Sequence, residues 1–101
     1  MPSWPNVAIG RRLTDSGTSV GANYRAACRA RSRAEFAAKI GVALEEADES
    51  AFWLELLDER RYGPQRSAAL LKLLRLEAGE LSAILAASSI TARESLARPR
   101  Q

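Results

Sequence analysis

The sequence predicts an all-α protein, folded as an up-and-down antiparallel bundle of three long helices. Apolar and small residues recur at alternating spacings of four and three along almost the whole chain, which is the spacing of a helix seam. Only four prolines and six glycines interrupt 101 residues, and aromatic residues make up 6%, which argues against a many-turned β-sandwich. The 47% of apolar residues exclude a disordered chain. We expect one domain over residues 1–96, followed by a disordered tail at 97–101.

The first helix is predicted over residues 6–30. Its middle, 14–18, has the composition of a turn, and propensity alone predicts a break there. The seam nevertheless stays in phase across this stretch, whereas a turn would usually shift it, so we expect one helix that at most kinks near Gly17. Asn23 lies on the seam, where we expect it to fix the helix register or to bond to another helix. The seam positions are Ile9, Leu13, Ser16, Val20, Asn23, Ala27 and Ala30.

The second helix is predicted over residues 33–61, and it begins with a capping box. The hydroxyl of Ser32 is expected to accept from the Glu35 amide, while the glutamate reaches back to the Ser32 amide. Gly63 is placed to be the left-handed residue after the helix, and Pro64 to be the first residue of the next one. The seam positions are Phe36, Ile40, Ala43, Ala47, Ser50, Leu54 and Leu57.

The third helix is predicted over residues 64–93, and it should fray before Pro99. Its seam positions are Leu71, Leu74, Ala78, Leu81, Leu85, Ser88 and Ala92. It carries further apolar residues outside this seam, at Leu70, Leu73, Leu76, Ile84 and Ile90. The second helix likewise has a second apolar stripe. A helix that is apolar over more than about 100° needs more than one partner, so we predict a homo-oligomer. The expected interface anchors are Leu44, Phe52, Trp53 and Leu56.

Charge is segregated along the chain. Residues 1–33 hold six arginines and one acid, residues 34–59 hold one base and eight acids, and residues 60–76 hold five bases and no acid. Two interpretations remain open: an acidic helix attracted to basic helices on both sides, or a basic N-terminal surface that binds nucleic acid. The arginines of the second interpretation are Arg11, Arg12, Arg25, Arg29, Arg31 and Arg33.

Composition argues against an enzyme. The chain has no histidine, which excludes Ser-His-Asp triads and Cys-His dyads, and one cysteine, which excludes an internal disulfide and multi-cysteine zinc sites. We expect no metal, no cofactor and no small-molecule substrate; the acidic run 45–49 is expected to be solvated or paired with arginine, and Cys28 to be buried. The apolar runs are too short to span a bilayer, and no signal peptide is evident, so we expect a cytoplasmic protein.

One segment carries a family resemblance. Residues 16–27 (SGTSVGANYRAA) resemble the bacterial four-helix-bundle family, also called the 23S ribosomal RNA intervening-sequence proteins, which includes the accessory protein of diversity-generating retroelements. The likeness covers about residues 8–93. Supporting matches are Ser32, Glu35-Phe36, Lys39-Ile40, 45–49, 53–57, Leu70-Leu71, Glu77-Ala78 and Glu80-Leu81. It implies an up-and-down bundle, ring-like homopentamers, no enzymatic activity and, for the accessory members, a basic partner of a reverse transcriptase and its RNA.

The chain departs from this family pattern in two places. Family members have a whole helix before the segment that corresponds to 6–30, but only five residues precede it here, so the first helix looks absent. A misassigned start, a truncation or a neighbouring chain that covers the gap would each account for this. Asp15 stands where many relatives have arginine. We therefore expect a non-enzymatic bundle acting through self-assembly and partner binding, or alternatively a nucleic-acid-binding accessory protein.

Overall fold

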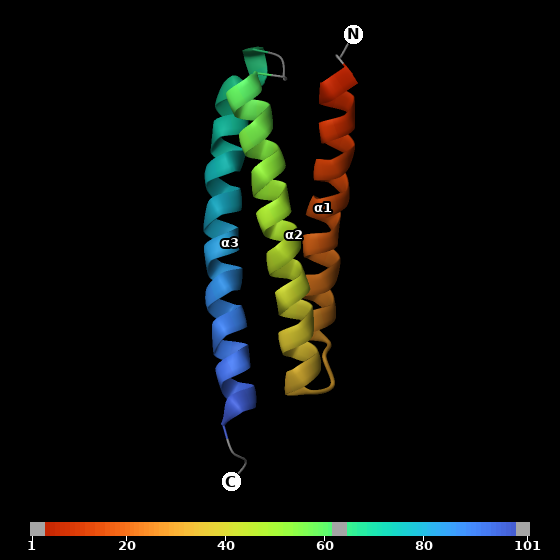
Figure 1. Ribbon diagram of the computed structural model, residues 1–101, viewed down its shortest axis with the longest axis vertical. Helices are drawn as coiled ribbons and strands as arrows, with labels where there is room; N and C mark the ends of the chain where they lie inside the picture. The colour runs from red at the N-terminus through yellow and green to blue at the C-terminus, as the bar shows by residue number, and fades with distance from the viewer. Residues whose placement is uncertain (1–3, 62–64, 99–101) are drawn as a thin grey trace.

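The computed structural model describes residues 4–61 and 65–98, and within them it is all-α with no strand. Helix α1 (Trp4–Cys28), helix α2 (Arg33–Arg60) and helix α3 (Ala68–Ala97) run down, up and down in turn, and a short 3-10 turn η1 (Gln65–Ser67) leads into α3 (Figure 1). The predicted up-and-down arrangement is confirmed. The third helix begins at Ala68 instead of Pro64, because η1 precedes it, and it ends four residues beyond the predicted residue 93.

Helix α1 is unbroken across the stretch that resembles a turn (Figure 1). The Thr14 hydroxyl donates to the Gly10 carbonyl at 2.8 Å, and the Thr18 hydroxyl donates to the Thr14 carbonyl at 2.8 Å. These hydroxyls therefore bond back to the preceding turn of their own helix, a pattern that serine and threonine adopt inside helices. The in-phase seam predicted the continuity correctly.

The two ends of α2 differ in detail from the prediction. The Ser32 hydroxyl accepts from the Glu35 amide at 3.0 Å as expected, but Glu35 accepts from the Arg31 amide at 3.2 Å and not from that of Ser32. Ser32 is extended (φ −152°, ψ 161°), so the amide that faces the first turn is one residue earlier. At the other end the left-handed residue is Arg61 (φ 53°), while Gly63 and Pro64 lie outside the described residues.

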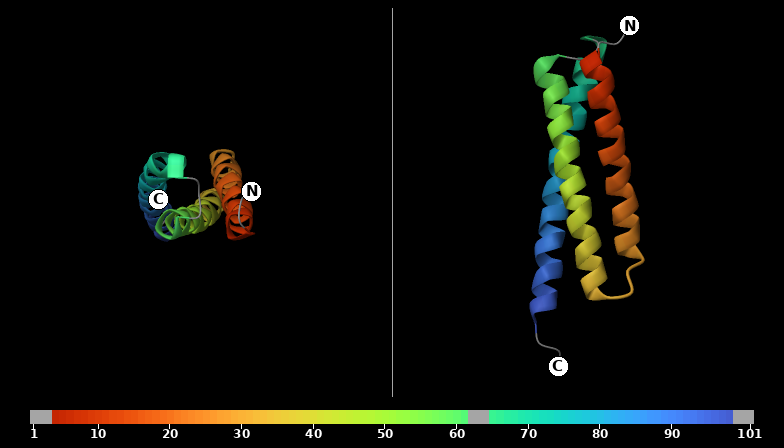
Figure 2. Two further views of the ribbon diagram at one scale, coloured as in Figure 1. Left: turned by 90° about the horizontal axis from the view of Figure 1, so that it is seen from above. Right: turned by 45° about the vertical axis from the view of Figure 1, so that its right-hand side comes forward.

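Helix α2 is the centre of the fold. Helices α1 and α3 each pack along α2, and no Cα atom of one lies within 8 Å of a Cα atom of the other in the described ranges. Seen from above, the three helices form a U with α2 at its base (Figure 2). We call the side on which α1 and α3 do not meet the open face.

The buried core is small and centres on α2. Ile40 is 1% exposed, and it packs in a cluster with residues from both neighbouring helices. The cluster consists of Ala27, Ile40, Ala43, Ala47 and Leu85, with Val20 and Leu44 packed against it. Because most of these side chains are alanines, the helices approach closely but bury little volume. The molecule is a rod of 60 × 19 × 15 Å.

Candidate assembly surface

A hollow of about 790 Å³ lies at one end of the open face. All three helices contribute to it: Cys28 near the end of α1, Phe36 in α2, and Ser88 and Thr91 in α3, with Arg31 from the loop between α1 and α2. The residues that line the hollow mark the side of each helix that is turned toward the open face. Residues seven apart on a helix share a stripe, so the same stripes can be followed from the hollow along α1 and α3.

Apolar side chains line the α3 wall of the open face. Leu81 lies seven residues before Ser88, and Ile84 lies seven residues before Thr91. Leu81 is 42% exposed and Ile84 is 63% exposed. On the same stripes, Leu74 and Leu70 are also exposed. The wall therefore presents large apolar side chains to water, interrupted by Glu77, which lies between Leu70 and Ile84 on their stripe.

The predicted seam of α3 is split between two directions. Leu85 and Ala92 are buried against α2, whereas Leu74 and Leu81, which belong to the same seam, are exposed on the open face. A seam of this kind points between two neighbouring helices. In α3 only one of those neighbours, α2, is present.

Glycines recur along the α1 wall of the open face. Gly21 lies seven residues before Cys28, which lines the hollow, and Gly17 and Gly10 lie eleven and eighteen residues before it, close to whole numbers of helical turns. Val7 and Thr14 share the stripe of Gly21 and Cys28. A Cβ built on Gly10, Gly17 or Gly21 would meet nothing within 4 Å. Glycine inside a helix costs about 0.5–1 kcal/mol relative to alanine. None of the side chains in the described part of the chain packs into the space that these three glycines leave.

The four predicted anchors do not gather on the open face. Leu44 packs against the core, so it is used inside the chain. Phe52 is 53% exposed, Trp53 and Leu56 are half-buried, and the rings of Phe52 and Trp53 meet edge to face with centroids 4.9 Å apart. Phe52 lies two residues from the buried Ser50, about 200° around the helix. Phe52, Trp53 and Leu56, which we call the outer patch, are thus a second apolar surface.

One buried polar contact joins α1 to α2. The hydroxyls of Ser16 and Ser50 are 2.7 Å apart, and both serines are buried. Asn23, which was expected to bond to another helix, instead donates to the Ser19 carbonyl of its own helix at 2.9 Å, so that part of the prediction is wrong. Ser16 and Ser50 both lie on predicted seams, and two small hydroxyl residues on facing seams were the signal for this contact.

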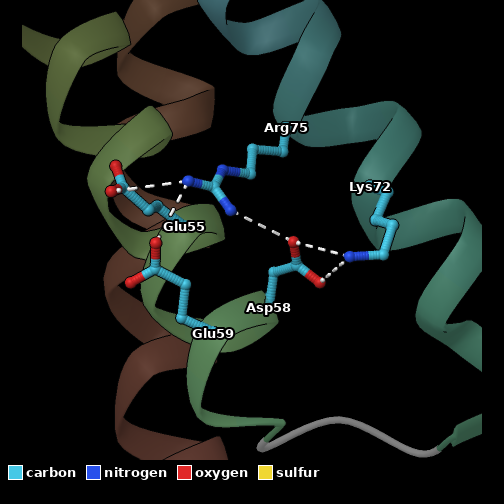
Figure 3. Close-up of polar contacts among 5 residues, drawn as sticks. All are labelled: Glu55, Asp58, Glu59, Lys72 and Arg75. Carbon is cyan, nitrogen blue, oxygen red and sulfur yellow. Dashed lines mark hydrogen bonds and ion pairs between the residues drawn. The ribbon is translucent and has the colours of Figure 1, made fainter.

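Ion pairs join α2 to α3 (Figure 3). Asp58 accepts from Arg75 at 3.2 Å and from Lys72 at 3.4 Å, and Arg75 also meets Glu55 at 3.5 Å and Glu59 at 3.2 Å. Burial works to raise the pKa of Asp58, but hydrogen bonds from Arg75 and Lys72 and their positive charges outweigh it, so this pKa lies below its ordinary value. The predicted attraction between acidic and basic helices is confirmed for this pair.

No described ion pair joins α2 to α1. Glu46, half-buried on α2, has its pKa raised by burial and by the neighbouring charges and hydrogen bonding of Glu49, with a smaller contribution from Glu45. These acids therefore repel one another, and among the residues described none of them forms an ion pair with α1. The predicted attraction of the acidic helix to its basic neighbours is thus observed between α2 and α3, and not between α2 and α1 among the residues described.

The six arginines of the nucleic-acid interpretation are all exposed, but they do not form one patch. Arg31 and Arg33 line the hollow, and Arg33 donates to the Ser95 carbonyl at 3.1 Å. Arg29 precedes them at the same end of the molecule, whereas Arg12 lies about 25 Å away along α1 from the 1.5 Å rise per residue. Arg11 lies beside Arg12, and Arg25 lies one turn before Arg29.

Three further points concern Cys28, metal binding and membrane spanning. Cys28 is exposed, not buried as expected, because its neighbour Ala27 occupies the position that faces α2. Within residues 4–61 and 65–98, no three acidic or cysteine side chains stand close enough to hold a metal ion. In the same ranges, no helix combines the length and the apolarity that crossing a bilayer requires.

Comparisons with known proteins agree with the all-α arrangement. The family model described as 23S rRNA-intervening sequence protein matches residues 2–90. A solved structure from Bacteroides thetaiotaomicron VPI-5482, a protein of unknown function from the S23 ribosomal protein family, is 34% identical with a TM-score of 0.68. The match covers 80% of this chain and 72% of that one. A search of curated proteins finds no match.

Proposed function

Because the chain belongs to the 23S rRNA-intervening sequence protein family, whose solved relative has no known function, we propose a function that rests on the surface of the molecule. The protein is a non-enzymatic helical scaffold that assembles with copies of itself and, once assembled, binds a partner macromolecule. The absence of histidine from the sequence and the use of Asp58, Glu55 and Glu59 in ion pairs support a non-catalytic role.

The observation that carries this proposal is the excess of exposed surface. The chain exposes 7413 Å². A compact monomer of 11.0 kDa exposes about 5,600 Å², so the surplus is about 1,800 Å². Its radius of gyration is 16.2 Å, compared with about 13 Å for a compact domain of this length. Eight of the large apolar side chains in contact with water lie on α3. Monomers seldom expose apolar patches beyond a few hundred Å².

Sedimentation equilibrium over a range of concentrations tests the assembly. We expect a mass that is a multiple of the 11.0 kDa of one chain at micromolar concentration. A monomer that persists at tens of micromolar, with no association at higher concentration, contradicts the proposal.

A second candidate, binding of nucleic acid through α1 and the loop after it, is favoured by one observation. The basic residues of this segment have no described ion pair with the acidic α2, so their charge is available to phosphate. RNA binding whose affinity falls steeply with salt, and falls less steeply in the double variant Arg29→Gln, Arg31→Gln, supports it. No binding at about 50 mM salt contradicts it.

A further inference from the structure

We propose that the open face binds one amphipathic helix of a different polypeptide, which lies along α1 and α3 and completes a four-helix arrangement. This inference rests on the proposed function, since it specifies the partner of the scaffold and the surface that binds it. The docked helix covers the open face and leaves the outer patch of α2 free for contacts between copies. The inference is therefore compatible with the ring-like assembly that the family resemblance implies.

The described helices leave room for one further helix. Helices α1 and α3 both pack on α2 and form the two arms of the U (Figure 2). Neighbouring helices in a bundle lie about 8–10 Å apart, so a position beside both arms and opposite α2 is the fourth corner of a four-helix arrangement. The exposed seam residues Leu74 and Leu81 lie on the side of α3 that faces this corner, and the hollow lies at one end of it.

The two walls favour different side chains on the docked helix. Leu81 and Ile84 are exposed on the α3 wall, so the stripe of the docked helix that faces α3 needs small residues such as alanine. On the α1 wall, a Cβ at Gly10, Gly17 or Gly21 would meet nothing within 4 Å, so the stripe that faces α1 has room for large residues such as leucine. Docking stabilises the complex because the exposed apolar surface of both walls leaves water.

The charges of the open face define the charges of its partner. Arg31 and Arg33 are the charged residues that line the hollow. Glu77 lies in the α3 wall on the stripe of Leu70 and Ile84, and it forms no ion pair within the part of the chain that the structure describes. We therefore expect the docked helix to carry an acidic residue beside the arginines and a basic residue beside Glu77.

The positions of these charges also define the spacing and the direction of the docked helix. Arg33 donates to the Ser95 carbonyl at 3.1 Å, so these two residues lie at the same level of the molecule. Glu77 lies 18 residues before Ser95, which is five turns or about 27 Å along α3. The acidic and basic residues of the docked helix are then about 18 residues apart on one stripe. Because the helix dipole favours acids in the first turn, the docked helix begins at the hollow and runs parallel to α2.

The exposed area is sufficient for a stable complex. The surplus of about 1,800 Å² exceeds the roughly 800 Å² per partner that a standard interface buries. A helix as long as α2, with 28 residues, extends about 42 Å and spans both the hollow and the wall around Glu77. Its docking would also cover Cys28, which lines the hollow and is exposed in the single chain.

A designed peptide tests the site. It is as long as α2 and carries a leucine stripe for α1 beside an alanine stripe for α3, with glutamate in its first turn and lysine 18 residues later. In the control peptide the glutamate and the lysine exchange places, so the composition and the apolar stripes are unchanged. Titration of the full chain, followed by fluorescence anisotropy and circular dichroism, should show a one-to-one complex with a gain of helix, and about tenfold weaker binding of the control. No binding at tens of micromolar, or equal binding of both peptides, overturns the inference.

A matched pair of leucine and isoleucine variants locates the peptide on the α3 wall. Ile84→Glu places a charge on the open face, and Leu76→Glu places the same charge on the same helix at a similarly exposed site: the wild-type side chains are 63% and 67% exposed. Leu76 lines a separate depression with Gly79 and Arg75, away from the open face. We expect about tenfold weaker peptide binding for Ile84→Glu, which buries an unpaired carboxylate, and unchanged binding for Leu76→Glu. Helical circular dichroism shows that both variants fold, and equal binding by both contradicts the proposed site.

A matched pair of glycine variants tests the α1 wall. A Cβ at Gly17 or Gly79 meets nothing within 4 Å, so leucine at either site should raise the thermal stability of the single chain. Gly17→Leu fills the space that the leucine stripe of the peptide needs and should weaken binding about tenfold. Gly79→Leu, on the side away from the open face, should leave binding intact. A gain in stability combined with a loss of binding is a result that misfolding cannot produce, and unchanged binding by Gly17→Leu is against the inference.

A charge reversal tests the pairing at Glu77. Glu77→Lys should bind the first peptide about tenfold more weakly, because two like charges then meet. A third peptide, in which glutamate replaces only the lysine, should bind Glu77→Lys more tightly than it binds the wild type. A reciprocal gain of this kind cannot come from a structural defect in the variant. If Glu77→Lys binds all three peptides as the wild type does, the inference is wrong.

The direction of the docked helix is tested through Cys28, the one cysteine in the sequence, which is exposed at the hollow. One version of the peptide carries a cysteine at its N-terminus and another carries it at its C-terminus. In a buffer of reduced and oxidised glutathione, the N-terminal version should form the disulfide with Cys28 to a much greater extent, because docking holds the two thiols at the same end of the molecule. A preference for the C-terminal version overturns the direction and with it the assigned charges.

The mass of the chain without peptide separates this inference from the proposed function. If the chain is a monomer that binds the peptide at the open face, self-assembly fails and the helix site stands. If the chain assembles and Ile84→Glu dissociates it, while the peptide neither binds nor dissociates the assembly, a second copy occupies the open face and the inference is wrong. An assembly whose mass is unchanged in Ile84→Glu, and which binds one peptide per chain, supports both.

Discussion

The two junctions made by α2 use different chemistry, although they have similar lengths. The junction with α3 combines apolar packing through Leu85 with the ion pairs around Asp58. The junction with α1 relies on close packing of alanines and on the bond between Ser16 and Ser50. Both flanking segments are basic in the sequence, so the difference shows that segregated charge does not by itself decide which helices pair.

Because the two junctions differ in this way, more unpaired charge remains on the α1 side of α2 than on the α3 side. On the α3 side the ion pairs neutralise the acids of the last turns of α2. On the α1 side Glu46 and its acidic neighbours repel one another, and the arginines of α1 are exposed. The α1 side is therefore the side from which further partners gain most by electrostatic attraction.

The largest expected effect comes from the α1 junction. Ser50→Val removes one partner of the buried serine pair and leaves the Ser16 hydroxyl only its 3.3 Å bond to the Leu13 carbonyl, which we expect to lower the free energy of unfolding by about 1 kcal/mol. Urea denaturation followed by circular dichroism measures this. The double variant Ser16→Ala, Ser50→Ala is the control, and it should lose less than Ser50→Val because it removes both hydroxyls together and leaves neither with a single, longer bond. A double variant that is worse than the single one would contradict this account of the junction.

A smaller effect is expected at the α3 junction. Asp58→Asn removes the charge that Arg75 and Lys72 share, so the melting temperature should drop by a few degrees, and added salt should shrink the difference. Since the pKa of Asp58 is lowered on folding, its contribution is complete above the ordinary value of 3.8 and is lost as the pH falls through the lower folded value. Melting temperatures measured over a series of pH values should therefore show this loss of stability in the wild type and not in Asp58→Asn. Asp15→Asn, at an exposed site on α1, serves as the control and should change nothing.

The smallest effect is expected at Glu46. Its pKa is raised above the ordinary 4.5 on folding, so the folded state binds more protons, and stability falls as the pH rises from 4.5 through the folded value. Glu46→Gln should remove this fall and raise the melting temperature slightly at neutral pH. The difference from the wild type should disappear in acid. A variant that is less stable than the wild type at pH 7 would mean that Glu46 has a cationic partner on the α1 side.

Periodicity in the sequence was enough to predict the three helices and their seams. It predicted α1 as one helix against the local composition of residues 14–18, because a seam that stays in phase reports tertiary packing and composition reports only local preference. The first turn of α3 was misplaced, since Pro64 suits a helix start but the residues after it form the 3-10 turn η1. The exact ends of a helix depend on individual hydrogen bonds, which the spacing of apolar residues does not reveal.

The open face could be predicted from the sequence only in part. A seam predicts that a helix has neighbours but not which of them are present, so Leu74 and Leu81 lie on the predicted seam although they are exposed in the single chain. Leu44, an expected interface anchor, is partly buried against the core of its own chain and stays a predicted anchor. The stripe of glycines on α1 was visible, but its position on the open face required the fold. Asn23 was misjudged because a bond to its own helix competes with one across helices.

That every tertiary contact between helices passes through α2 also bears on how the chain folds. Contacts connect only helices that are adjacent in the sequence, and proteins with such local topology fold within microseconds to milliseconds. The amides of α2 should then exchange most slowly with solvent deuterium. Those of α1 should open in a separate, lower-energy step that leaves the hairpin of α2 and α3 in place.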